Sequence, residues 1–168
     1  MKTTTQILML MAVISFMSCG QLHVVTLYVD TEAIPSPPLP SKSSIDQYAN
    51  FGQPAGVANK DYATIVRKGD LIIWRGESIS NPEHVVKITS IDHYEGEEII
   101  KLKPFNTIMR KDGPVAQIGS NELVRAKVIL KPGKEEAYIR EEYILTFTVS
   151  NKTGTFTIDP EVQGHKKK

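Results

Sequence analysis

Most of the chain alternates short runs of apolar and β-branched residues with clusters of turn-forming residues. Runs of this kind, bounded by Gly, Pro, Asn and Asp, are typical of β-strands. They fill most of the sequence after residue 21. We expect strands at 22–29, 61–66, 71–75, 84–91, 98–103, 123–130, 138–150 and 155–158.

The clearest alternation lies near the C-terminus, where large apolar residues occupy every second position. They are Tyr143, Leu145, Phe147 and Val149, with Thr146 and Thr148 between them. A period of two predicts a half-buried strand. The continuous apolar run of 71–75 instead predicts a strand buried on both faces, with Trp74 in the core. The stretch 134–142 fits either a helix or the start of the long strand.

Turn signals separate these runs. Gly-containing polar clusters lie at 67–70, 92–97 and 151–154, and the proline-rich stretch 35–44 predicts a loop. About seven to nine short strands with such spacing predict a sandwich or barrel. We therefore expect one all-β domain, an antiparallel sandwich or barrel, preceded by a signal peptide.

The first segment does not follow this pattern. Residues 7–17 are an apolar run behind Lys2, and the single cysteine of the chain follows in Ser18-Cys19-Gly20. The run is shorter than the ~20 residues that cross a bilayer, and its length is typical of an export signal. It resembles a bacterial lipoprotein signal, although Phe16 stands where that pattern prefers Leu. The alternatives are an ordinary signal peptide with a chance cysteine, or an uncleaved anchor.

The resemblance implies cleavage between Ser18 and Cys19 and a lipid on Cys19, which would make the membrane a partner of the protein. Because one acyl chain binds a bilayer only marginally, stable anchoring needs the several chains of a lipoprotein. Gly20 rather than Asp after the cysteine implies passage to the outer membrane of a Gram-negative bacterium. The expected organisation is a signal at 1–18, a tether at 19–23, a sandwich domain at 24–163 and a basic tail at 164–168.

Charge and cysteine content exclude several classes of function. The net charge is +1, from 20 basic and 19 acidic residues, so there is no concentrated basic field for nucleic acid. One cysteine permits neither an internal disulfide nor a cysteine-based metal cluster. The terminal lysines, 166–168, are expected to be a solvated tail.

No catalytic arrangement is evident in the sequence. It contains no G-x-S-x-G elbow and no phosphate-binding glycine loop. His23 and His165 are expected to be exposed, and His84 to lie at a strand edge. We therefore predict no enzymatic activity, no catalytic residue and no cofactor, while a hydrolase with an unrecognised site stays open.

The densest polar cluster is 92–98. Asp92, Glu95 and Glu97 could bind Ca²⁺, but their spacing fits no known loop, and a solvated turn that binds no metal is the favoured interpretation. Four aromatic residues could form a sugar-stacking surface or be structural: Tyr48, Phe51, Tyr62 and Tyr94. A lectin-like, Ca²⁺-assisted carbohydrate-binding module is therefore the second functional hypothesis.

Three segments in order resemble the AidA/PixA inclusion-body protein family: VTLYVDTEAI at 25–34, GDLIIWRGE at 69–77 and YILTFTVSNKTGTFTIDPEV at 143–162. The resemblance spans most of the chain after the signal and implies a single compact, antiparallel β-sandwich of immunoglobulin-like or cupredoxin-like form. It also implies an abundant, sometimes self-associating protein without established enzymatic activity. The lipoprotein signal is a departure, since typical members are cytoplasmic.

The leading interpretation is a non-enzymatic, lipid-anchored protein of the cell envelope. Its β-sandwich would serve binding or assembly, with a second copy, another protein or a glycan as the partner. The sequence does not identify the ligand.

Overall fold

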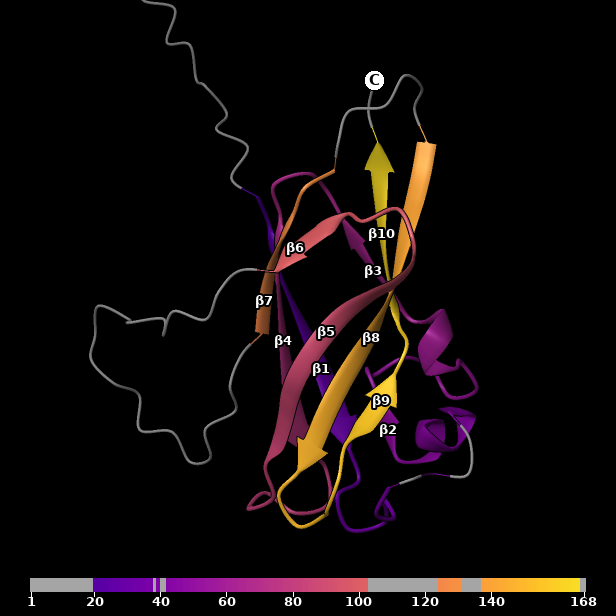
Figure 1. Cartoon of the computed structure of the whole chain (residues 1–168), viewed down its shortest axis with the longest axis vertical. Helices are drawn as coiled ribbons and strands as arrows, with labels where there is room; N and C mark the ends of the chain where they lie inside the picture. The colour runs from indigo at the N-terminus through magenta and orange to yellow at the C-terminus, as the bar shows by residue number, and fades with distance from the viewer. Residues whose placement is uncertain (1–19, 38, 40–41, 103–123, 131–136, 167–168) are drawn as a thin grey trace, which may run out of the picture.

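The computed structural model describes residues 20–37, 39, 42–102, 124–130 and 137–166. Within this part of the chain the regular structure is almost entirely β (Figure 1). The strands are β1 (Leu22–Val29), β2 (Ala49–Asn50), β3 (Ala63–Val66), β4 (Leu71–Ser78), β5 (Val86–Gly96), β6 (Ile100–Leu102), β7 (Val124–Val128), β8 (Ala137–Val149), β9 (Phe156–Ile158) and β10 (Glu161–Lys166). Two short 3₁₀ helices lie between them, η1 (Lys42–Gln47) and η2 (Asn59–Asp61).

The strands form two sheets that pack face to face. The first has the order β2-β1-β4-β7-β6, and the second has the order β3-β10-β8-β5 with β9 also paired to β8. Buried residues from both sheets form one core between them. The predicted all-β sandwich is confirmed. No helix among the described residues is long and apolar enough to cross a membrane.

Two strand pairs are parallel, which corrects the expectation of a purely antiparallel sandwich. β1 runs parallel to β4, and β3 runs parallel to β10. The remaining pairs are antiparallel. Alternation along a strand shows which side chains face the core, but it carries no information about the direction of the neighbouring strand.

The core confirms the predicted alternation of β8. Its four alternate apolar residues from Tyr143 to Val149 are at most 1% exposed. Trp74 is fully buried and donates its indole N–H to the Tyr143 hydroxyl at 2.8 Å, with the two rings edge to face. Burial raises the pKa of Tyr143, so the phenol stays neutral. The polar groups of Trp74 and Tyr143 are therefore partners of each other inside the core.

The turn predicted at 92–97 is wrong, because β5 continues to Gly96. The long strand β8 supplies partners for this extension, and His93 lies opposite Tyr143. Gly96, with φ at 90°, lies where a side chain would overlap the carbonyl oxygen of Arg140. The helical alternative for 134–142 is also wrong from residue 137 onward, which lies in β8, while 134–136 lie outside the described residues.

Both ends of the domain extend further than expected. Leu22 and His23, assigned to the tether, are the first residues of β1 and pair with β4. β10, which the sequence analysis missed, runs to Lys166, so residues 164–166 are strand rather than tail. Main-chain pairing with a neighbouring strand explains both extensions.

Candidate functional site

The predicted lipidation site lies just before the first residue that the structure describes. Ser18, Cys19 and the signal 1–18 fall outside the described residues, so the cleavage and the lipid stay predictions. Gly20 follows Cys19 directly and is described. The end of the sandwich at which β1 begins is therefore the candidate functional site.

The chain is fixed to the sandwich from its first described residue. Gln21 donates its N–H to the Asp70 carboxylate at 2.7 Å and accepts the N–H of Leu71 at 2.9 Å. A Cβ built on Gly20 would overlap the carbonyl oxygen of Gly69. No tether is present in the described part of the predicted 19–23 segment.

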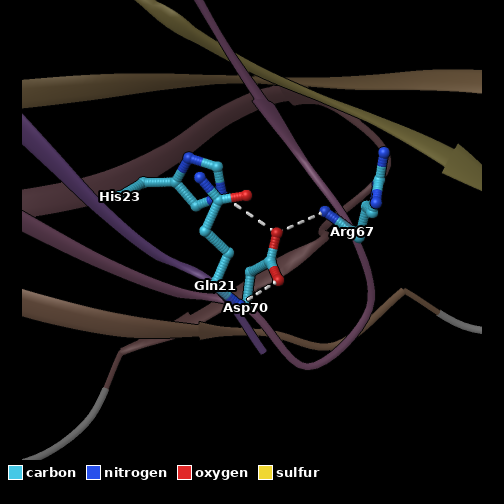
Figure 2. A network of polar contacts seen from close by, with 4 residues as sticks. All are labelled: Gln21, His23, Arg67 and Asp70. Atoms are coloured by element: carbon cyan, nitrogen blue, oxygen red, sulfur yellow. Dashed lines mark hydrogen bonds and ion pairs between the residues drawn. The ribbon is translucent and has the colours of Figure 1, made fainter. Parts of the chain in front are cut away.

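The carboxylate of Asp70 is the centre of this arrangement (Figure 2). Besides the Gln21 bond, its Oδ2 accepts the N–H of Arg67 at 2.8 Å and lies 2.9 Å from Nε2 of His23. Asp70 is only 4% exposed. Burial raises its pKa, but the hydrogen bonds from His23, Arg67 and Gln21 together lower the pKa below its ordinary value of 3.8. The group is therefore ionised at neutral pH. We call Gly20, Gln21, His23, Arg67 and Asp70 the N-terminal clamp.

The turn at 67–70 holds the carboxylate in place. Asp70 donates its N–H to the Arg67 carbonyl at 3.1 Å, and Gly69 adopts the left-handed conformation with φ at 91°. Val128 of β7 donates its N–H to the Asp70 carbonyl at 2.9 Å and accepts the N–H of Gly69 at 3.1 Å. The turn, which the sequence predicted, is thus bonded to β7 as well as to the chain start.

A hydroxyl cluster lies where β1 ends. The Oγ1 of Thr31 is 2.7 Å from the hydroxyl of Ser78, 3.2 Å from that of Ser80 and 2.9 Å from Nδ1 of His84. Thr31 is fully buried, so its hydroxyl cannot reach a substrate. Sequence reasoning missed this cluster, because only tertiary pairing brings the end of β1 to the segment after β4. It holds those two segments together and leaves His84 in a structural contact.

Glu141 of β8 was also missed. It is 1% exposed, and its Oε2 accepts the N–H groups of Ile99 and Ile100 at 2.6 and 2.9 Å. Its Oε1 lies 3.1 Å from Nδ1 of His93. A sequence signal was present, because Glu141 stands two positions before Tyr143 on the inward-facing register. We call Glu141, Ile99, Ile100 and His93 the inter-sheet clamp, since Glu141 and Ile100 belong to different sheets.

The acidic cluster at 92–98 does not converge on a point. Asp92, Glu95 and Glu97 are exposed on or beside β5, and His93 is directed to Glu141 instead. In the part of the chain that the structure describes, no three His, Cys, Asp or Glu side chains are placed to hold a metal ion.

The aromatic residues considered for sugar stacking do not form one surface. Phe51 stacks on Tyr62 with ring centroids 4.7 Å apart, and Phe51 is only 7% exposed. Tyr48 is packed against the core, whereas Tyr94 is exposed on β5. His165, expected in an exposed tail, lies on β10 with its ring 4.7 Å from that of Tyr138.

Comparisons with known proteins found matches among solved structures alone. No family model and no curated protein matches the sequence. Among solved structures, 7 chains match. One is the crystal structure of an inclusion body protein (PixA) from Burkholderia cenocepacia J2315, with 13% identity and a TM-score of 0.42 over 91% of this chain and 99% of that one. Membership of the family that the sequence motifs resemble stays a prediction.

Proposed function

We propose that the mature chain is a non-enzymatic lipoprotein of the cell envelope, anchored through lipidated Cys19, whose β-sandwich serves binding or assembly at the membrane. The export signal and the position of the only cysteine support the anchor. The observation that carries the proposal is the N-terminal clamp, because it connects the residue after Cys19 directly to the folded domain.

The clamp determines what a lipid on Cys19 would do. Neighbouring Cα atoms are about 3.8 Å apart, so the lipidated residue lies within one peptide of Gly20. Gly20 and Gln21 are bonded to or packed against the 67–70 turn. The lipid would hold the domain close to the bilayer with a restricted orientation. This arrangement fits a protein that acts at the membrane surface.

The outer membrane of a Gram-negative cell is the proposed destination, since Gly20 and not Asp follows the cysteine. The structure gives Gly20 a second role, because the Gly69 carbonyl leaves no room for a side chain there. Packing excludes every side chain at this position, and glycine is also compatible with the proposed sorting. The partner at the membrane is proposed to be a second copy, another protein or a glycan.

The anchor is tested by expressing the full chain in a Gram-negative host and measuring the mass of its mature N-terminus together with membrane fractionation. We expect an acylated N-terminal Cys19 and recovery in the outer membrane. The variant Cys19→Ser should lose the acyl mass and most of the membrane-bound fraction, because Ser supplies no thiol for the thioether.

A matched control moves the thiol instead of removing it. Ser36 is exposed in the loop after β1, so Cys19→Ser combined with Ser36→Cys keeps one thiol in the chain at another position. It should behave like Cys19→Ser alone. A protein that retains Met1 and carries no acyl group would contradict the proposal.

A further inference from the structure

The outer face of the first sheet is apolar next to the chain start. On β1, Leu22 and Val24 are 52% and 53% exposed, and on β4, Leu71 is 41% exposed with Ile73 half-buried beside it. Of the neighbours that face the core, Val25, Ile72 and Trp74 are buried and His23 is half-buried. The prediction that 71–75 is buried on both faces is therefore wrong, because β4 is fully buried on one face only. We call Leu22, Val24, Leu71 and Ile73 the apolar patch.

Strand register makes the patch continuous. Leu22 lies opposite Leu71 and Val24 lies opposite Ile73 in the parallel pair of β1 and β4. Adjacent strands are about 4.8 Å apart, and alternate residues along a strand about 7 Å apart. The four side chains therefore form a compact block at the end of the sandwich that holds the N-terminal clamp.

Basic side chains on β7 and β6 continue the two cross-strand pairs of the apolar patch, Leu22–Leu71 and Val24–Ile73. Lys127 of β7 lies opposite Leu71 and is itself opposite Lys101 of β6, while Arg125 lies opposite Ile73. Lys101 and Lys127 are exposed and Arg125 is half-buried. Among the described residues, no carboxylate forms an ion pair with any of these three side chains. We call them the basic row.

The outer face of the second sheet differs in character. There, Arg140 is paired with Glu142 at 2.8 Å and with Glu161 at 3.6 Å, so its charge is compensated. Thr146 and Thr148 continue the face along β8. The exposed apolar residues of this second face, Ile65 on β3 and Tyr138 on β8, are separated by β10. In the part of the chain that the structure describes, only the outer face of the first sheet combines a continuous apolar patch with cations that form no ion pair to a carboxylate.

We propose that the apolar patch and the basic row dock onto the anionic phospholipid surface of the membrane that holds the anchor. The inference rests on the proposed function, because it places a lipid on Cys19, three residues before Leu22. Aliphatic side chains favour the boundary between headgroups and acyl chains, and cations near an anionic leaflet gain electrostatic attraction. The lipid therefore brings to the bilayer the face whose chemistry complements it.

Site-directed spin labels on the full lipidated protein test this orientation. Because the lipid occupies the only natural cysteine, an introduced cysteine can be labelled specifically. Val24→Cys reports the patch. Ile79→Cys is the matched control, since Ile79 is 59% exposed and follows the opposite end of β4. The protein is reconstituted in phosphatidylethanolamine vesicles containing about a quarter phosphatidylglycerol, an anionic lipid.

The readout is the accessibility of each label to oxygen, which partitions into the bilayer, relative to a water-soluble nickel complex. We expect this ratio to be several-fold higher for the label at position 24 than for the label at position 79. High salt should reduce the difference, because screening weakens the attraction of the basic row.

A charge variant tests the basic row separately. Arg125→Gln combined with Lys127→Gln should lower the ratio of oxygen to nickel accessibility at position 24 towards that of a label in water. Lys60→Gln, which removes an exposed lysine of η2, should leave this ratio unchanged. Thermal unfolding of the charge variants should match that of the parent, which separates lost docking from lost folding.

Each other outcome overturns the inference in a recognisable way. If both labels on an acylated protein were equally exposed to water, the patch would not contact the bilayer, and a protein partner would be the better candidate for this face. Spin–spin broadening at position 24 would assign the face to a second copy of the chain. An N-terminus without acyl mass would instead overturn the proposed function, and with it the docking that depends on the anchor.

Discussion

Two buried carboxylates, Asp70 and Glu141, have the same kinds of hydrogen-bond partner but connect different parts of the molecule. Each accepts two backbone N–H groups and lies within 3.1 Å of a histidine nitrogen. Asp70 connects the chain start to the turn before β4, all at one end of the sandwich. Glu141 connects β8 of the second sheet to Ile100 of the first.

The comparison shows that burial of a carboxylate does not by itself indicate catalysis. General acid–base chemistry and metal binding need accessible lone pairs at the site. Both oxygens of Asp70 and of Glu141 are occupied by hydrogen bonds within the protein. The carboxylates therefore serve as cross-links, and the consequence of losing each depends on the segments that it joins.

The largest effect is expected for Glu141→Ala, which should lower the free energy of unfolding by about 3–5 kcal/mol because it leaves two buried N–H groups without an acceptor. Urea denaturation measures this loss. Glu142→Ala is the matched control, since its side chain is 22% exposed and it should lose at most ~1 kcal/mol with its ion pair to Arg140. Equal losses would refute the cross-link between sheets.

Asp70→Ala should cost about 2–3 kcal/mol, and its effect should be local to the chain start. Hydrogen exchange should become faster at the amides of Gln21 and Arg67, which lose their acceptor, while the amides of Ile99 and Ile100 keep their protection. Asp61→Ala, at an exposed position in η2, should leave all four amides unchanged. Loss of protection throughout the domain would remove the distinction between the two clamps.

The stability that Asp70 supplies should depend on pH. Its pKa is lowered in the folded chain from the ordinary value of 3.8, so the unfolded chain takes up the proton more readily. This contribution is present above pH 3.8 and is lost as the pH falls through the lowered folded pKa. Denaturation over an acid pH series should show a weaker dependence for Asp70→Asn than for the parent. Identical slopes would show that Asp70 does not contribute.

The smallest effects concern the two histidines. The His23 side chain is 18% exposed, whereas that of His93 is 42% exposed, so solvent screens the second contact more. We expect His23→Ala to lower the free energy of unfolding by about 1 kcal/mol and His93→Ala to lower it by about 0.3 kcal/mol, measured by urea denaturation at neutral pH. A larger loss for His93→Ala than for His23→Ala would mean that solvent exposure does not determine how much these contacts stabilise the protein.

The sequence by itself determined the local features of this protein. The strand at 22–29, the alternation from Tyr143 to Val149, the core position of Trp74 and the turn at 67–70 follow from side-chain period and from glycine at a left-handed position. These properties depend on neighbours only a few residues away, so they can be inferred before any fold is known. The sequence also predicts the export signal and the lipidation of Cys19, and both stay predictions.

Only the tertiary structure decided which segments become partners. The parallel pairs, the extension of β5, the strand β10 and both carboxylate clamps join residues that are distant in sequence. Gln21 and Asp70 differ by 49 in residue number, and Ile99 and Glu141 differ by 42. A carboxylate at an inward-facing position can accept a hydrogen bond from many different donors. The local sequence does not specify which of these donors the fold brings near it. The apolar patch likewise requires the register of β1 against β4, which main-chain hydrogen bonding establishes once the sheet has formed.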